Sequence, residues 1–308
     1  MPIRADRLLA LAIPERRQRY TWRDAALYAL GVGVGIDPLD EDQLRFVDET
    51  RLRVLPSFAT VLAYPGFWIR DLDTGIDWRR VVNGGQEVRL HHPLPPEGEV
   101  VAQTRIVDLT DKGAGKGALI TTERVVVDTA AGRPLATVRQ TVLCRGDGGF
   151  SGAAPAATPR PLARPAGEAV GEKAGAAETE APIRVTLPTH SQLALVYRLS
   201  GDLNPLHLDP AVARAAGFDR PILHGLATYG IACHALVKGL CGYDPTRARA
   251  MAGRFSSPVL PGETITVDIR PDGPGRASFR ALAAERGAVV IDQGRFDYEG
   301  GQIVRRQE

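Results

Sequence analysis

Alternating hydrophobic and polar residues predict β-strands in two groups along the chain. The first group is expected at residues 86–90, 99–109, 118–128 and 135–144, and the second at residues 263–270, 276–285 and 288–298. In the run 135–144 the inward-facing positions are apolar except for Gln140, which breaks the alternation. Both groups are typical of strands in antiparallel sheets that bury one face.

Other segments repeat apolar residues at the three- and four-residue spacing of a helix. The clearest helix is expected at residues 225–240, and another at residues 22–30, where Thr21 and Asp24 resemble a capping box. A third helix is expected to begin near Pro56, because proline is favoured at the first helical position. Each half of the chain therefore combines a helical start with a run of strands.

A change in composition divides the chain. Residues 151–182 are rich in Ala, Pro, Gly and Glu and too poor in large apolar residues to fold, which predicts a flexible linker. The linker separates an N-terminal domain, residues 1–150, from a C-terminal domain, residues 183–308. The two halves share a pattern of elements, which predicts an α+β fold duplicated within one chain.

Composition and charge exclude several classes of protein. The 38 basic and 36 acidic residues give a net charge of +2, so we expect no nucleic-acid partner. No apolar run is long enough to cross a membrane, and the first apolar run is broken by Pro14. The three cysteines form no C-x-x-C pair, which favours a reducing compartment. We therefore expect a cytoplasmic protein without a membrane partner.

The candidate chemistry lies in the stretch Ser200-Gly201-Asp202-Leu203-Asn204-Pro205-Leu206-His207. Gly201 and Pro205 exclude a regular helix, so an irregular loop could direct Asp202 and His207 to one point as an acid/base pair. His224-Gly225 follows at the start of the helix expected at residues 225–240, where free amides carry positive partial charge. The residue pattern alone also allows Asp202 to be a turn residue and His207 a structural histidine.

Other catalytic and binding motifs do not occur in the sequence. The six histidines show no H-E-x-x-H or comparable spacing, so we expect no metal site. No G-x-S-x-G nucleophile elbow occurs. We also expect no cofactor.

The segment from Tyr197 to Gly230 closely resembles the signature of the MaoC-like, R-specific enoyl-CoA hydratases, in which Gly-Asp-x-Asn-Pro-Leu-His precedes Pro-Ile-Leu-His-Gly. The first half resembles the N-terminal half of the two-domain members at residues 28–33, 90–95, 111–113 and 145–150. The resemblance implies a double hot-dog fold, in which each half wraps an antiparallel sheet around one long helix. It also implies an acyl-CoA partner and a homodimer.

The resemblance further implies roles for single residues. Asp202 and His207 match the catalytic dyad, Asn204 matches a residue that holds water and dyad, and the backbone amide of Gly225 matches the donor to the thioester oxygen. Residues expected to contact the substrate are Asn83, Gly84, Lys112, Leu203, Pro205, Leu206, His224 and Phe255. One departure occurs at Val82-Asn83-Gly84-Gly85-Gln86, where relatives often read Leu-His-Gly-Glu-Gln.

The resulting hypothesis is reversible hydration of trans-2-enoyl-CoA to (3R)-3-hydroxyacyl-CoA, with the first half holding the acyl tail. Two alternatives stay open on the sequence. A hot-dog thioesterase usually carries a carboxylate on the long helix, but residues 225–240 contain no Asp or Glu. A non-catalytic acyl-CoA-binding module would fit the first half, which lacks the Asp/His motif.

Overall fold

The computed structural model describes residues 3–151 and 182–300, and within these residues eleven strands form one antiparallel sheet. The strand order is β1-β3-β5-β6-β2-β8-β11-β10-β9-β7, and β4 pairs with β5 beside this path. Strands of the first half are β1 (Arg16–Tyr20), β2 (Val81–Leu90), β3 (Gly98–Ala102), β4 (Thr104–Asp111), β5 (Ala118–Asp128) and β6 (Arg133–Cys144). Strands of the second half are β7 (Ile183–Leu187), β8 (Ala248–Phe255), β9 (Ile265–Pro271), β10 (Arg276–Ala283) and β11 (Ala288–Tyr298).

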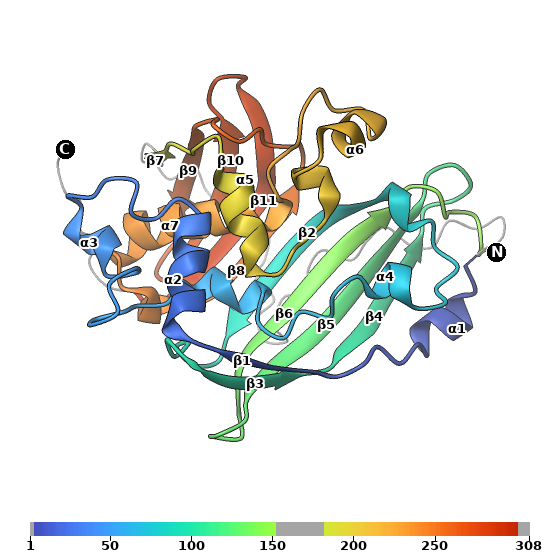
Figure 1. Ribbon diagram of the computed structural model, residues 1–308, viewed down its shortest axis with the longest axis horizontal. Coiled ribbons are helices and arrows are strands. Elements are labelled where there is room, and N and C mark those ends of the chain that lie inside the picture. Colours follow the sequence, from blue (N-terminus) through green and yellow to red (C-terminus); the bar gives the residue numbers. More distant parts are fainter. Residues whose placement is uncertain (1–2, 152–181, 301–308) are drawn as a thin grey trace.

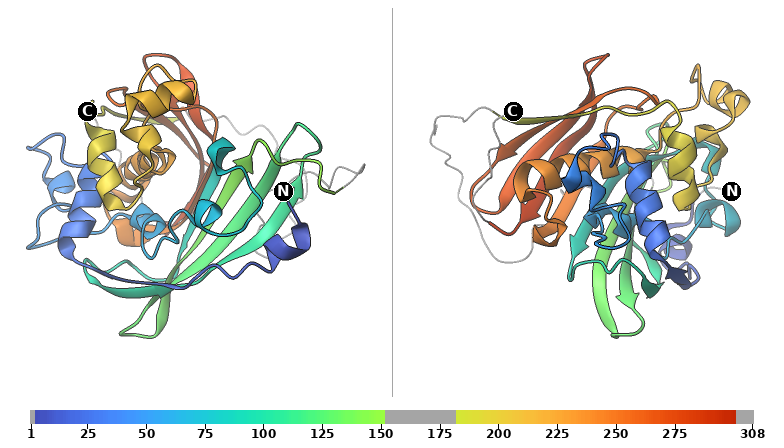
Figure 2. Two further views of the ribbon diagram at one scale, coloured as in Figure 1. Left: turned by 45° about the vertical axis from the view of Figure 1, so that its right-hand side comes forward. Right: turned by 60° about the vertical axis from the view of Figure 1, so that its left-hand side comes forward.

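The α-helices are α1 (Ala5–Leu9), α2 (Trp22–Gly31), α3 (Glu41–Leu44), α4 (Trp68–Asp71), α5 (Leu193–Tyr197), α6 (Pro210–Ala215) and α7 (Gly225–Cys241). Short 3-10 helices are η1 (Pro56–Thr60), η2 (Trp78–Arg80), η3 (Arg198–Ser200), η4 (Pro205–His207) and η5 (Pro245–Arg247). Helix α7 packs on β7, β8, β9 and β11 and lies in the concave side of the second half of the sheet (Figures 1 and 2). It is almost entirely buried because its residues are apolar on all sides.

The two halves join along β2 and β8, which pair antiparallel with Gln86 opposite Gly253. Helix α7 also contacts η1 of the first half, and α2 packs against α5 of the second half. This is the double hot-dog fold that the sequence predicts: two half-sheets in one chain, placed edge to edge. The junction brings residues of β2 close to the N-terminus of α7.

The prediction of a third α-helix from Pro56 was wrong, because this segment is a short 3-10 helix. The segment that begins at Pro56 forms only the five-residue 3-10 helix η1, because Ala63 has a positive φ of 46° and Tyr64 precedes a proline. The first half therefore has no long helix comparable to α7 within the described residues. The single strand expected at 99–109 is two strands, β3 and β4, which separate at Gln103.

The core consists of two apolar clusters. The larger cluster fills the space around α7 and α2 and includes Val88 and Val138, and the smaller one lies between α1, α4 and β4–β6 and includes Ile120 and Val142. Within the described part of the chain no helix is long and apolar enough to cross a bilayer. The expected linker, residues 151–182, falls almost entirely on residues outside the described ranges.

Candidate active site

The loop that carries Asp202 is fixed by its own side chains. Gly201 has a φ of 117°, which favours glycine, and it ends η3. The Asp202 carboxylate accepts a hydrogen bond from the amide of Asn204 at 3.2 Å. The Asn204 side chain in turn accepts one from the amide of Leu206 at 3.0 Å and so begins η4. Asn204 therefore supports the loop locally, and its expected role in holding water and dyad stays a prediction.

His207 lies at the end of η4 and is buried, with 7% of its surface exposed. Its Nδ1 donates to the carbonyl of Ile222 at 2.9 Å, which leaves Nε2 unprotonated in the neutral ring. Burial lowers the pKa of His207, while the nearby Asp202 carboxylate acts in the opposite direction. The imidazole is therefore neutral near pH 7 and able to accept a proton at Nε2.

His224 shapes the site from the other side of the loop. Its ring is fully buried and packs against that of His207, with centroids 3.7 Å apart. Its Nε2 donates to the backbone carbonyl of Asp202 at 3.1 Å, and its Nδ1 is buried without a partner. Burial, with a contribution from His207, lowers the pKa of His224 to about 3. His224 is thus a neutral residue that ties the Asp202 loop to the start of α7.

Gly225 begins α7, so its amide belongs to the first turn, where backbone N–H groups have no partner within the helix. A Cβ added to Gly225 would lie 3.5 Å from Nδ2 of Asn83 and 3.6 Å from the ring of Phe255. Asn83 Oδ1 accepts a hydrogen bond from Gln140 Nε2 at 2.8 Å. The structure therefore brings Asn83 and Phe255 together with Gly225, as the resemblance implies.

The other predicted residues lie on β2, on the loop that carries the dyad and on the β4–β5 hairpin. Gly84 forms the β-bulge of β2, where an added Cβ would lie 3.3 Å from the carbonyl oxygen of Thr141. Leu203 is 59% exposed, Pro205 is exposed and Leu206 half-buried, all on the loop between Asp202 and His207. Lys112 is exposed at the tip of the β4–β5 hairpin, where its amide donates to the Gly117 carbonyl at 3.0 Å.

The hairpin tip is held to the end of the first half by Asp111. Its carboxylate accepts hydrogen bonds from the amides of Gly113, Gly149 and Ser151. Although burial acts in the opposite direction, these bonds lower the pKa of Asp111 to about 2. Lys112 is therefore an exposed residue on a turn that the hydrogen bonds of Asp111 hold in place.

Sequence reasoning missed two residues of this neighbourhood. Tyr197 is fully buried with its ring 5.0 Å from that of His224, but a tyrosine in an apolar segment gives no signal that separates it from the core. Gln140 contacts Asn83, and its signal was present: it is the polar exception in an otherwise apolar strand face. Such exceptions indicate positions where a buried polar partner is required.

Asp202, His207 and His224 could offer metal-ligating atoms that lie within 4.8 Å of one another. The two imidazole rings, however, lie face to face at an interplanar angle of 30°. One nitrogen of each ring is hydrogen-bonded to a backbone carbonyl, and the expectation of no metal site stays a prediction.

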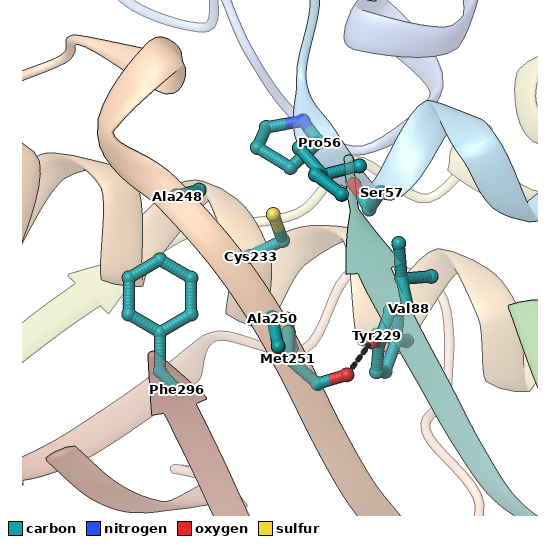
Figure 3. A pocket seen from close by; sticks show the side chains of 10 residues that line it. Pro56, Ser57, Val88, Tyr229, Cys233, Ala248, Ala250, Met251 and Phe296 are labelled. Atoms are coloured by element: carbon teal, nitrogen blue, oxygen red, sulfur yellow. Dashed lines mark hydrogen bonds between the residues drawn. The ribbon is translucent and has the colours of Figure 1, made fainter. Parts of the chain in front are cut away.

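A small cavity lies at the junction of the two halves (Figure 3). Its volume is about 10 Å³, which is room for about one water molecule. Ser57, Val88, Cys233 and Met251 line it, and the hydroxyl of Tyr229 donates to the Met251 carbonyl at 2.7 Å beside it. Cys233 lies eight residues after Gly225 on α7, or about 12 Å along the helix axis.

Comparisons with known proteins show the family of the chain. Residues 171–292 match the model of the MaoC like domain, and residues 18–146 match that of the MFE-2 hydratase 2 N-terminal domain. The chain is 39% identical over 292 residues to 3-hydroxyacyl-thioester dehydratase Y of Mycobacterium tuberculosis, covering 92% of this chain and 94% of that protein. It is 36% identical over 299 residues to the peroxisomal enoyl-CoA hydratase 2 of Arabidopsis thaliana, covering 93% of each.

Solved structures show the same likeness. The MaoC-like dehydratase from Phytophthora capsici superposes with a TM-score of 0.80 at 31% identity, covering 97% of this chain and all of that one. A Mycobacterium tuberculosis protein with a double hotdog fold gives a TM-score of 0.56 at 16% identity over 94% of each chain, a likeness of fold alone. With a hydratase 2 N-terminal domain followed by a MaoC-like domain, the chain belongs to the two-domain MaoC-like dehydratase and enoyl-CoA hydratase 2 family.

Proposed function

We propose that this protein catalyses the reversible addition of water to trans-2-enoyl-CoA, forming (3R)-3-hydroxyacyl-CoA. The observation that carries the proposal is the placement of Asp202 and His207 on one fixed loop, tied through Ile222 and His224 to the segment that begins α7 at Gly225. Relatives of similar length are named as hydratases and dehydratases of acyl thioesters, which supports the same reaction class.

In this mechanism Asp202 and His207 hold one water molecule between them. The water oxygen bonds to the β-carbon while one proton leaves it for the dyad, and the dyad delivers a proton to the α-carbon on the same face. The π electrons of the double bond move toward the thioester, so negative charge develops on its oxygen. The Gly225 amide at the N-terminus of α7 stabilises that charge, and such a donor typically contributes about 100- to 1,000-fold in rate.

The substrate spans both halves in this proposal. Residues 183–308 supply the dyad, and residues 1–150 accommodate the acyl tail and part of the CoA. Asn83, Gly84 and Phe255 border the thioester, and the loop residues Leu203, Pro205 and Leu206 border its entry. His224, which the resemblance also places at the substrate, is fully buried against His207 and supports the dyad instead. Lys112 on its exposed hairpin offers a cation to the CoA phosphates. We also propose that two chains form a homodimer.

Absorbance of the enoyl-thioester band tests the reaction, with crotonyl-CoA and trans-2-decenoyl-CoA as separate substrates and chiral analysis of the product. Loss of the band with an R product is expected. Absence of any loss with both substrates, or an S product, would contradict the proposal. A thiol reagent added in parallel with saturated decanoyl-CoA distinguishes hydration from thioester hydrolysis, because only hydrolysis releases free CoA.

A further inference from the structure

A β-bulge turns the side chain of Asn83 toward α7. Val88 belongs to the core, and strict alternation would place Asn83, five residues earlier on β2, on the opposite face of the sheet. Asn83 nevertheless pairs in register with Val142, which is buried on the core side of β6, because the bulge at Gly84 adds one residue to β2. The side chain of Asn83 is therefore directed into the molecule, where it lies beside Gly225.

Gln140 determines which end of the Asn83 amide faces α7. Its Nε2 donates to Asn83 Oδ1 at 2.8 Å, so the oxygen end of the amide is engaged with β6. The other end, Nδ2, carries two N–H donors and lies 3.5 Å from the position that a Cβ would take on Gly225. Within the described ranges Nδ2 forms no hydrogen bond, and the residue is only half-buried. The amide therefore presents unpaired donors beside the first residue of α7.

The spacing between Asn83 and the backbone amide of Gly225 suits one shared acceptor. The nitrogen and Cβ of a residue are about 2.5 Å apart, so Nδ2 of Asn83 and the nitrogen of Gly225 are separated by at most about 6 Å. Donors to an oxyanion lie about 2.7–3.1 Å from the oxygen, so an oxygen between these two nitrogens could accept from both.

The ring of Phe255 adds an apolar side to the same place. It would lie 3.6 Å from a Cβ on Gly225, and the missing side chain leaves the space between the ring and the two donors open. Gly225 is half-buried, so a ligand can reach this space from outside. Because an apolar neighbour lowers the local dielectric, hydrogen bonds to a charged oxygen are stronger there than in water.

We propose that the side-chain amide of Asn83 donates a second hydrogen bond to the thioester oxygen, beside the backbone amide of Gly225, and that Gln140 positions it. This inference rests on the proposed function and adds a catalytic residue to it. As water adds to the β-carbon and electrons move toward the thioester, the growing negative charge on the oxygen strengthens both hydrogen bonds. Gln140 acts only through Asn83, since without it the amide can turn over and direct its own oxygen at that charge.

Steady-state hydration of crotonyl-CoA tests the two roles. Asn83→Leu removes the donor and fills its place, so kcat is expected to fall about 100- to 1,000-fold with KM changed less than about twofold, as for the loss of an oxyanion donor. Gln140→Met removes the hydrogen bond that orients Asn83 and should lower kcat about tenfold. In the Asn83→Leu background, Gln140→Met should change kcat less than about twofold, because Gln140 then has no amide to position.

Infrared difference spectroscopy tests the hydrogen bond without catalysis. Butanoyl-CoA labelled with a heavy carbon isotope at the thioester carbonyl has no double bond to hydrate, and hydrogen bonds lower the stretching frequency of its carbonyl. The frequency in the bound state should be higher in Asn83→Leu than in the wild type, with Gln140→Met between them. Gln86→Met is the matched control, because it removes a buried amide of β2 that donates to backbone carbonyls, and it should keep the wild-type frequency and kcat.

An unchanged carbonyl frequency or an unchanged kcat in a folded Asn83→Leu protein would overturn the inference. Equal losses of kcat in Gln140→Met and Gln86→Met, or a further tenfold loss in the double variant, would reject the positioning role of Gln140. Circular dichroism checks folding. If Asn83→Leu does not fold, Asn83→Asp replaces it with the same expected changes, because a carboxylate still accepts from Gln140 but has no N–H donor.

The two measurements also separate this inference from the proposed reaction. A carbonyl frequency that depends on Asn83, in a wild-type protein that does not hydrate crotonyl-CoA, would reject the reaction and retain the hydrogen bond. Hydration by the wild type with a carbonyl frequency that is the same in Asn83→Leu would reject the hydrogen bond and retain the reaction.

Discussion

The imidazole rings of His207 and His224 lie face to face, with centroids 3.7 Å apart and an interplanar angle of 30°. One ring nitrogen of each donates to a backbone carbonyl, Nδ1 of His207 to Ile222 and Nε2 of His224 to Asp202. The stack and the two hydrogen bonds therefore fix the orientation of His207 and the path of the Asp202 loop together. His224 acts in this view as a positioning residue for the dyad.

His224→Phe keeps a flat ring against His207 but loses the hydrogen bond to Asp202. We expect kcat for crotonyl-CoA to fall about tenfold, as one buried hydrogen bond implies, with KM changed less than twofold. His224→Ala also removes the stack and should lower kcat about 100-fold, because His207 can then turn away. Steady-state kinetics of both variants check this. A rise in KM at constant kcat would indicate a role in substrate binding instead.

Asp202→Asn is expected to abolish most activity and leave the fold intact. The amide oxygen of the new side chain can still accept the hydrogen bond from Asn204, whereas the charge needed for proton transfer is lost. A loss of about 100- to 10,000-fold in kcat is expected, the range for general acid/base catalysis. Asp209→Asn is the matched control, because Asp209 likewise accepts backbone hydrogen bonds, at the start of α6. Equal activity of the two variants would contradict the role of Asp202.

The sequence predicts those parts of the site whose residues are close together in the chain. It does not predict contacts between residues that are far apart in the chain. Asp202, Asn204 and His207 lie within six residues, and glycine, proline and turn-forming side chains encode their loop locally. The ring stack between His207 and His224 joins residues 17 positions apart, and the contact of Asn83 with Gly225 depends on the pairing of β2 with β8. No local pattern encodes such pairings.

Two of the strands that the sequence analysis missed, β1 and β8, have a similar cause. Strand β1 reads Arg-Arg-Gln-Arg-Tyr, with one apolar residue, and β8 is rich in alanine with a glycine, so neither shows the alternation typical of a strand. Their conformation is fixed by partners, β3 for β1 and both β2 and β11 for β8. Tertiary pairing overrides weak local preference here.

Substitution of alanine for Gly225 or Gly230 on α7 should have opposite effects. Gly225→Ala should impair activity and keep stability, whereas Gly230→Ala should lower stability. At Gly225 an added Cβ would meet its nearest atoms at 3.5–3.7 Å, an ordinary contact, so the protein should fold normally. The methyl group would nevertheless stand beside the amide proposed to bind the thioester oxygen, and we expect a loss of about 100-fold or more in kcat/KM.

At Gly230 an added Cβ would overlap Val32 and approach the hydroxyl of Tyr28 to 2.9 Å. Gly230→Ala should therefore lower the free energy of unfolding by about 1–3 kcal/mol, the usual cost of overpacking. Urea unfolding of the two variants, beside their kinetics, checks both predictions. A destabilised Gly225→Ala protein would leave its loss of activity without a catalytic interpretation, and full activity would contradict the role of the amide.

His234, in the middle of α7, predicts a loss of stability in acid. It is fully buried, and burial, with a contribution from Lys238, lowers its pKa from 6.5 to about 4. The unfolded chain therefore binds a proton at this residue as the pH falls below 6.5, while the folded protein does not until about pH 4. The contribution of His234 to the free energy of unfolding is therefore fully present above pH 6.5. It is lost as the pH falls, by about 3 kcal/mol once pH 4 is reached.

His234→Gln removes this titration. The difference in the free energy of unfolding between pH 7.5 and pH 5 should become smaller by about 2 kcal/mol than in the wild type, whatever the stability of the variant at pH 7.5. His190→Gln is the control, because His190 is exposed, and it should keep the wild-type difference. Urea unfolding at the two pH values measures both. An unchanged difference in His234→Gln would mean that the folded protein protonates His234 as readily as the unfolded chain, and that burial does not keep the ring neutral.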